Sequence, residues 1–178
     1  MFEIPLSYQE ATAAIIGNCI GANNVPLAIR FYKLSSWITA ITVVLLQLVI
    51  LFGRNAIATY FLASKEAQQM AESVLVVIGV MFFFDGMQTY MQGPIRAIDL
   101  QDRASWITFL VYYLIGLPLA SYLALWTSLG IVGLQLGICV AIVLQFLTYA
   151  IILKQSDWHQ IALKAQQRMK EEEIELQK

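Results

Sequence analysis

Charged residues are scarce in this sequence. Only 13% of its 178 residues are charged, which is about half the fraction in a typical water-soluble domain. In contrast, 59% are hydrophobic and the mean hydropathy is +0.68. The block 104–153 contains no Asp, Glu, Lys or Arg at all. A chain with so little charge needs lipid as its solvent, which excludes a water-soluble domain and argues against a nucleic-acid partner.

The motifs of soluble enzymes are missing as well. The sequence has no glycine-rich phosphate loop followed by Lys and Ser or Thr, no HExxH and no paired CxxC. Its two cysteines, Cys19 and Cys139, have no second ligand at a metal-binding spacing, so we interpret them as small apolar side chains. The sequence therefore predicts no enzyme, metal site or cofactor, and any transport would use an ion gradient instead of ATP.

Long runs without charge predict transmembrane helices, because about 20 residues that rise 1.5 Å each cross a hydrocarbon core of about 30 Å. The block 104–153 is too long for one helix and divides at the turn sequence 125–130. Period-two alternation, which barrel strands would require, is absent. The prediction is an all-α integral membrane protein of about five transmembrane helices, near residues 2–20, 34–53, 73–95, 105–124 and 131–153.

The opening helix and the tail differ from these apolar runs. The segment 2–20 carries Glu3 and Glu10, so an interfacial or partly exposed helix is its alternative. In the tail 154–178, charges alternate with apolar residues at helical spacing, which predicts an amphipathic helix on the cytoplasmic membrane surface. The positive-inside rule supports a cytoplasmic C-terminus, because that topology places every basic residue inside except two. The apolar positions of the tail are Trp158, Ile161, Ala162, Ala165 and Met169, and the two outside basic residues are Arg54 and Lys65.

One carboxylate interrupts the apolar helix predicted over 73–95. A charged group near the middle of a transmembrane helix costs about 2.5–3.5 kcal/mol, so such a residue usually faces a protein interior or a water-filled cavity. Asp85 is in this position. Because a carboxylate can hold a proton, a metal cation or a cationic substrate in turn, we predict that Asp85 couples ion and substrate. The alternative is that Asp85 bonds Gln88 or a neighbouring helix and only stabilises the bundle.

Three further polar residues are predicted to take part in ion or substrate coupling. Gln88 and Thr89 follow Asp85 by three and four residues and share its helix face. We expect them to line the same cavity, with polar contact between packed helices as the alternative. Glu10 is a weaker candidate of the same kind, because its own helix is less apolar.

Glycine and proline mark the expected helix contacts and bends. Two pairs of glycines have the four-residue spacing that lets helix backbones touch in lipid. A Gly-Pro step is predicted to end the Asp85 helix, and a second proline to bend the span 105–124, since proline removes a helix hydrogen bond. Bent helices serve gating in alternating-access carriers, although they also occur in inert bundles. The residues concerned are Gly17, Gly21, Gly93, Pro94, Gly116, Pro118, Gly133 and Gly137.

Four segments have the order and spacing of motifs from one family of membrane carriers. They are Gly17-Asn-Cys-Ile-Gly-Ala-Asn-Asn24 with Ala28-Ile-Arg30, Tyr112-Tyr-Leu-Ile-Gly-Leu-Pro-Leu119, Gly130-Ile-Val-Gly-Leu-Gln-Leu-Gly137, and Ser156-Asp-Trp158 with Ala165-Gln-Gln-Arg168. In that order they resemble the Gly-Asn-x-Leu-Gly-Ala-Gly-Asn loop with its Ala-x-Arg/Lys, the Tyr-Tyr-x-x-Gly-x-Pro segment, the Gly-x-x-Gly-Leu-Trp-x-Gly segment, and the Asn-Trp with basic tail of the multidrug and toxic compound extrusion (MATE) family. The matches cover nearly the whole chain.

The resemblance implies a fold and a function. It implies that residues 1–153 are a partial C-terminal lobe, helices eight to twelve of about twelve, with 154–178 as a cytoplasmic tail. The N-terminal lobe would then come from a missing part or from a second chain. The implied function is a secondary active antiporter, multi-pass in a plasma or organelle membrane, that exports small organic cations or drugs in exchange for H⁺ or Na⁺. A non-transporting membrane remnant or interaction subunit is the alternative.

The sequence also departs from the family pattern. The resemblance places Asp85 where the family carries an acidic residue, on the helix before an Arg-Gly-x-Gly-x-Gln loop. Here that loop reads Arg96-Ala-Ile-Asp-Leu-Gln101, so both glycines are replaced. Asn23 likewise stands where the second glycine of the first loop is expected.

Overall fold

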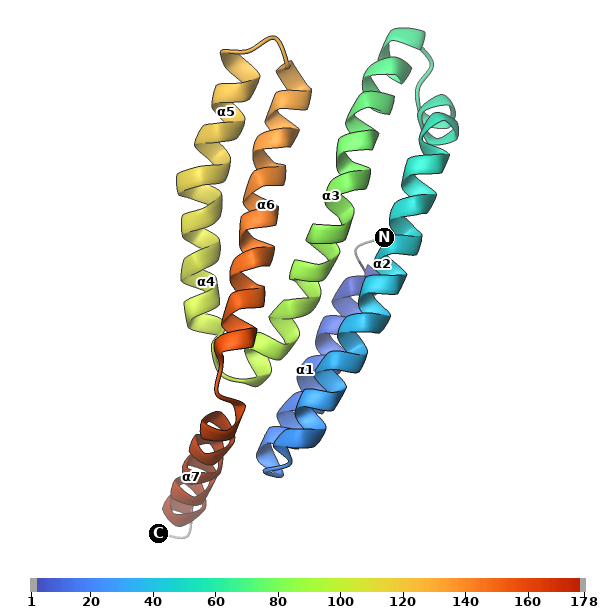
Figure 1. The fold of residues 1–178 in the computed structure, drawn as a ribbon. Helices are drawn as coiled ribbons and strands as arrows, with labels where there is room; N and C mark the ends of the chain where they lie inside the picture. Colours follow the sequence, from blue (N-terminus) through green and yellow to red (C-terminus); the bar gives the residue numbers. More distant parts are fainter. Residues whose placement is uncertain (1–2, 177–178) are drawn as a thin grey trace.

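The chain folds as a bundle of antiparallel helices (Figure 1). The computed structural model describes the backbone of residues 3–176 and the side chains of residues 3–168 and 171, and it contains no strand in this part of the chain. The predicted all-α fold is confirmed. The elements are α1 (Glu3–Gly21), α2 (Val25–Phe61), α3 (Lys65–Ala97), α4 (Gln101–Phe109), the π-helix η1 (Leu110–Gly116), α5 (Leu117–Leu125), α6 (Gly130–Gln155) and α7 (Trp158–Leu176).

Four helices of the described chain are long and apolar enough to cross a membrane. They are α2, α3, α6 and the continuous helix Gln101–Leu125, which α4, η1 and α5 form together. The expected fifth span, α1, is a helix of 19 residues but is not among the four. Its first half carries Glu3, Gln9 and Glu10, and it packs against α2 and α3.

The helices are longer than the uncharged runs that predicted them. At 37 residues α2 is about 56 Å long, well beyond the hydrocarbon thickness, whereas the prediction covered only 34–53. The reason is that helix hydrogen bonds continue through charged residues, and the capping residues determine where each helix begins. The Asn24 side chain accepts from the Leu27 N–H (3.3 Å) at the start of α2, and Ser64 caps α3 in the same way. The prediction that Gly93-Pro94 ends the Asp85 helix is wrong, because α3 continues to Ala97.

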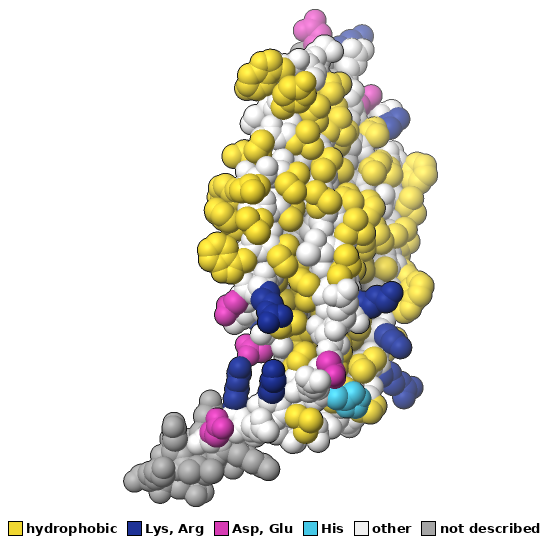
Figure 2. All heavy atoms as spheres, turned by 60° about the vertical axis from the view of Figure 1, so that its left-hand side comes forward, with side chains coloured by type: hydrophobic (Ala, Val, Ile, Leu, Met, Phe, Trp, Pro, Cys, Tyr) yellow, Lys and Arg dark blue, Asp and Glu magenta, His cyan; other side chains and the backbone are white. Residues whose placement is uncertain are grey.

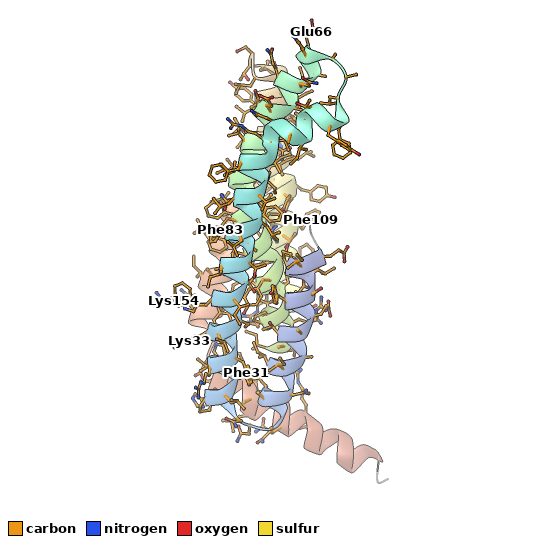
Figure 3. All side chains as sticks on the ribbon, turned by 90° about the vertical axis from the view of Figure 1, so that its right-hand side faces the viewer. Phe31, Lys33, Glu66, Phe83, Phe109 and Lys154 are labelled. Carbon is orange, nitrogen blue, oxygen red and sulfur yellow. The ribbon has the colours of Figure 1, made fainter. Side chains whose placement is uncertain are left out.

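The outer surface of the bundle is largely apolar, as a lipid-facing surface must be. Trp37, Phe52 and Leu114 are 71%, 85% and 66% exposed. Figure 2 shows hydrophobic side chains over most of the height of the bundle, with Lys and Arg gathered near the end from which α7 extends. In Figure 3, Lys33 and Lys154 lie toward that end and Glu66 at the other. We call the end from which α7 extends the basic end. It is defined by the helix ends that carry Arg30, Lys33, Arg96, Arg103 and Lys154.

The largest buried cluster lies near the basic end, where α7 meets the bundle. Its buried side chains include Ile16 of α1, Tyr90 of α3 and Tyr149 of α6. From α7, Trp158 packs with its ring centroid 5.6 Å from that of Tyr32, and Ala162 is fully buried. The apolar face of the amphipathic tail helix therefore covers the bundle itself. One residue predicted for this face, Met169, lies outside the described side chains.

Two of the three replaced loop glycines fall on residues with positive φ, and the third, Ala97, is the last residue of α3. Asn23, in the turn from α1 to α2, has φ +54°, and Asp99, in the turn from α3 to α4, has φ +59°. This left-handed conformation favours glycine, and Asn and Asp are the other residues that adopt it most readily. Asn23 and Asp99 therefore keep the turns that glycines would make at these two positions.

The two glycine pairs behave differently. In the Gly133–Gly137 pair, a Cβ on the first glycine would lie 2.6 Å from the Leu123 carbonyl oxygen, and one on the second would overlap the backbone of Ala120. This pair therefore marks a close contact between α6 and α5. In the Gly17–Gly21 pair, an added Cβ would meet no atom within 4 Å, so the same spacing marks no contact among the described residues.

Candidate ion and substrate coupling site

Asp85 lies near the middle of the bundle on α3 and is half-buried. Its carboxylate Oδ1 accepts a hydrogen bond of 2.9 Å from Nε2 of Gln88, whose side chain is almost completely buried. The same Nε2 donates to the hydroxyl of Tyr112 on η1 at 3.3 Å. Gln88 therefore connects the carboxylate to a neighbouring helix, and the structure brings together two of the residues that the sequence singled out.

Thr89 and Glu10 lie differently from Asp85 and Gln88. The Thr89 hydroxyl donates to the backbone carbonyl of Asp85 (2.8 Å), so its hydrogen is used within the helix. Glu10 forms an ion pair of 3.2 Å with Arg96, and the Glu10 and Arg96 side chains are 59% and 48% exposed. The structure thus places Glu10 in a surface ion pair at the basic end and not beside the Asp85 carboxylate.

Gln9 extends the contact at this end of α1. It is buried against α3, and Gly93 lies directly against its backbone. With its amide oriented to satisfy both atoms, Gln9 donates to the Thr89 carbonyl and accepts from Arg96, both at 3.1 Å. Polar as well as apolar contacts therefore hold α1 against the last three turns of α3.

Asp85 has no cationic partner among the described residues. The ion pairs in this part of the chain join Glu10 to Arg96 and Asp99 to Arg168. A carboxylate within a membrane-spanning helix is costly in its ionised form when no Lys or Arg pairs with it, so a bound proton or cation stabilises it. The arrangement can therefore hold a proton, a metal cation or an organic cation.

The helix is π-helical directly before the bend that was predicted at Gly116 and Pro118. Proline has no N–H and its ring clashes with the carbonyl one turn before it, so a regular α-helix cannot continue unchanged through Pro118. The Leu117 N–H donates instead to the Tyr112 carbonyl, five residues back. Such π-helical turns often occur at functional sites, and this one carries the Tyr112 side chain that contacts Gln88.

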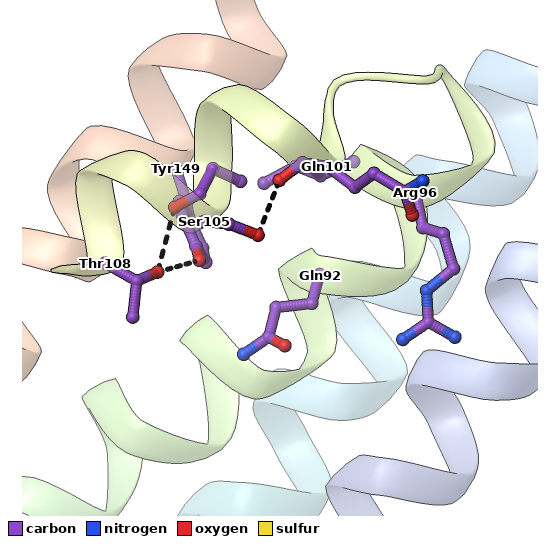
Figure 4. Close-up of a pocket in the computed structure, with 8 residues that line it drawn as sticks. Gln92, Arg96, Gln101, Ser105, Thr108 and Tyr149 are labelled. Carbon is purple, nitrogen blue, oxygen red and sulfur yellow. Dashed lines mark hydrogen bonds between the residues drawn. The ribbon is translucent and has the colours of Figure 1, made fainter.

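A second polar cluster, which the sequence reasoning missed, lies between α4 and α6. Gln145 is 2% exposed, and its Nε2 donates to the hydroxyls of Thr108 and Tyr149, both at 2.8 Å. The two hydroxyl oxygens are also 2.8 Å apart (Figure 4). These side chains are neutral and lie in the long uncharged block, so a search for charges passes over them. One of them, Thr108, belongs to a series of polar residues at helical spacing, which is a signal that could have found the cluster. The series is Gln101, Ser105, Thr108 and Tyr112.

Four apolar helices of membrane-spanning length define the class, which is a multi-pass membrane protein. The MatE family model matches residues 1–122, and this chain belongs to that family of transporters. The resemblance drawn from the four sequence motifs is confirmed.

Known proteins of the same family are similar over nearly the whole chain. Protein DETOXIFICATION 12 of Arabidopsis thaliana is 30% identical over 169 residues, an alignment that covers 95% of this chain and 35% of that protein. Multidrug and toxin extrusion protein 1 of Danio rerio is 28% identical over 161 residues, which cover 88% of this chain and 27% of that protein. The chain thus spans about a third of the length of the curated relatives it matches.

The fold has a close counterpart among solved structures. The crystal structure of the eukaryotic MATE transporter AtDTX14 superposes with a TM-score of 0.88 at 25% identity, covering 94% of this chain and 37% of that chain. A multidrug resistance MATE family transporter in an inward-facing conformation superposes with a TM-score of 0.70 at 16% identity. The helix arrangement is therefore that of part of a MATE transporter.

Proposed function

We propose that this chain forms part of a secondary active antiporter that exports small organic cations or other xenobiotics in exchange for H⁺ or Na⁺. The observation that carries the proposal is the Asp85 carboxylate, which lies within a membrane-spanning helix and has no ion-pair partner among the described residues. The names of two relatives, which refer to detoxification and to multidrug and toxin extrusion, agree with it.

Exchange follows from competition for one carboxylate. An uncompensated charge at this depth costs about 2.5–3.5 kcal/mol, so Asp85 is more stable with a proton, Na⁺ or a cationic substrate bound than alone. Because these ligands exclude one another, binding of the ion releases the substrate. Gln88 donates to Oδ1 of the Asp85 side chain at 2.9 Å, and Thr89 shares the same helix face of α3.

The positive-inside rule places the basic end, and α7 with it, in the cytoplasm. The membrane is a plasma or organelle membrane, and its lipids surround the apolar outer surface. The chain covers about a third of the length of its relatives. A further lobe, supplied by a longer protein or by a second chain, completes the substrate pathway.

The test is gradient-driven efflux of a cationic dye from proteoliposomes that contain this chain or the longest protein that includes it. Asp85→Asn removes the charge and is expected to lower H⁺- or Na⁺-driven efflux by about tenfold or more. Asp102→Asn is the matched control, because Asp102 is exposed in the first turn of α4 and makes no ion pair within the described residues. Equal efflux by the Asp85→Asn variant and the unchanged protein would contradict the proposal.

A non-transporting membrane remnant or interaction subunit is the second candidate. The hydrogen bonds that join Asp85, Gln88 and Tyr112 tie α3 to η1, and they would also serve a purely structural role. This candidate predicts no gradient-dependent efflux from the unchanged protein, together with a loss of thermal stability in Asp85→Asn.

A further inference from the structure

Two polar stripes face each other across the turn between α3 and α4. Residues three or four apart lie on one side of a helix, and each stripe keeps this spacing for three turns. The helices are antiparallel and joined by the short turn 98–100, so the start of one stripe lies opposite the end of the other. The stripes are Asp85, Gln88, Gln92 and Arg96 on α3, and Tyr112, Thr108, Ser105 and Gln101 on α4 and η1.

The stripes are joined by a hydrogen bond at one end and share a cavity at the other. At the inner end, Gln88 donates to the Tyr112 hydroxyl at 3.3 Å. At the basic end, polar residues of both stripes line a single cavity of about 350 Å³ together with Tyr149 of α6. Figure 4 shows these side chains around it: Gln92, Arg96, Gln101, Ser105, Thr108 and Tyr149.

Two buried amide oxygens next to the stripes have no donor. Gln88 is 5% exposed and Gln145 is 2% exposed, and each uses its Nε2 for two hydrogen bonds. In both, Oε1 has no hydrogen-bond partner among the described residues. A buried oxygen left unpaired is costly, and buried polar groups of this kind are usually satisfied by ordered water. One glutamine lies on α3 and the other on α6, so both sides of the second stripe need water.

We propose that water fills the space between the two polar stripes and forms an inlet that leads from the basic end of the bundle toward Asp85. The cavity forms the outer part of this inlet. Two of its lining residues, Gln101 and Thr108, are seven residues apart, so the cavity extends about 10 Å along the helix. The step from Thr108 to Tyr112 adds about 6 Å and reaches the bond to Gln88. Building on the proposed function, the inlet is the route by which H⁺ or hydrated Na⁺ exchanges between Asp85 and one side of the membrane.

Thiol labelling tests the inlet without requiring transport. In a background with Cys19→Ser and Cys139→Ser, Thr108→Cys places a thiol in the cavity. Leu110→Cys is the matched control, because it lies two residues further along the same helix and is 47% exposed on the apolar outer surface. Only the hydrated thiolate reacts with a charged methanethiosulfonate reagent, so Thr108→Cys is expected to react about tenfold faster or more in proteoliposomes.

A second pair repeats the comparison nearer the basic end if Thr108→Cys does not fold. Ser105→Cys lies in the cavity, and Trp106→Cys replaces the next side chain, which is 69% exposed. Filling the cavity with Gln92→Phe is expected to slow the labelling of Thr108→Cys by about fivefold or more, since water is then excluded.

Equal labelling rates for both matched pairs, or no effect of Gln92→Phe, would overturn the inlet. This result is independent of the proposed function. If the cavity thiols react rapidly while Asp85→Asn transports normally, the inlet stands and the coupling role of Asp85 fails. If Asp85→Asn abolishes efflux and the thiols do not react, the coupling role stands and the ion reaches Asp85 by another route.

Discussion

On one face of α3, glycines allow other helices to come close, whereas a neighbouring face of the same helix carries polar side chains. A Cβ at Gly86 would lie 2.8 Å from Val43 of α2, and one at Gly93 would overlap the backbone of Gln9 of α1. On the neighbouring face, Asp85 and Gln88 point toward η1, and an amide oxygen remains without a donor. The packed face therefore holds α3 against α1 and α2 by close backbone contact, whereas the polar face joins α3 to η1 through hydrogen bonds.

The largest expected effect is on the packed face. Gly93→Val forces two methyl groups against the Gln9 backbone, which cannot move aside as a flexible side chain would, and is expected to destabilise the protein by about 3 kcal/mol. Gly17→Val is the control, because no atom lies within 4 Å of a Cβ there, and it should change stability by less than about 1 kcal/mol. Thermal unfolding in detergent measures both. Similar losses for the two variants would remove the distinction between a packed and an open glycine.

On the polar face, Gln88→Leu removes the donor to the Asp85 carboxylate. A hydrogen bond to a charged group contributes about 1.5–3 kcal/mol, so the variant should be destabilised by roughly that amount. A double-mutant cycle with Asp85→Asn isolates the charge, and in that background the cost of Gln88→Leu is expected to fall by about 1 kcal/mol. If the cost is the same in both backgrounds, Gln88 acts by packing alone and the polar face behaves like the packed one.

The bond across to η1 is longer and should be worth less. Tyr112→Phe deletes the hydroxyl that accepts from Gln88 at 3.3 Å, and the expected loss is about 0.6 kcal/mol, an average value for hydrogen bonds between membrane helices. Tyr113→Phe is the control, since Tyr113 is the next residue and is 61% exposed on the outer surface. The midpoints of thermal unfolding of the two variants are measured side by side. Equal midpoints would show that the Tyr112 contact has no effect on stability.

The smallest effect is expected from Asn23→Gly, at the turn that sets α1 and α2 side by side against the packed face. Asn23 has φ +54°, so Asn23→Gly should stabilise the protein by about 0.5 kcal/mol, whereas Asn23→Ala should cost about 1 kcal/mol. Both are read from the midpoint of thermal unfolding. The strain argument fails if the alanine variant is as stable as the glycine variant.

The fold was largely predictable, and the site only in part. Apolar runs correctly predicted helices at every span, but their ends were wrong by up to nine residues, as at Val25, because caps such as Asn24 and not charges end a helix. Asp85 stood out because it is the one charge in an apolar run. Thr108, Gln145 and Tyr149 did not, since neutral polar residues also occur on helix surfaces without function. The partner of Glu10 is Arg96, 86 residues away, which no local pattern indicates.

The amino-acid sequence by itself determined that this chain is a set of apolar helices with one carboxylate at bilayer depth. Hydropathy and helix hydrogen bonds depend on residues within about four positions of each other, so both can be read locally. Only the tertiary structure decided which helix faces meet. Gly133 and Gly137 pack against α5, whereas a Cβ at Gly17 or Gly21 would meet no described atom within 4 Å. The structure likewise decided that Gln88 contacts Tyr112. Contacts between helices depend on how each is rotated about its axis, and that rotation is set by the packing of residues far apart in the chain.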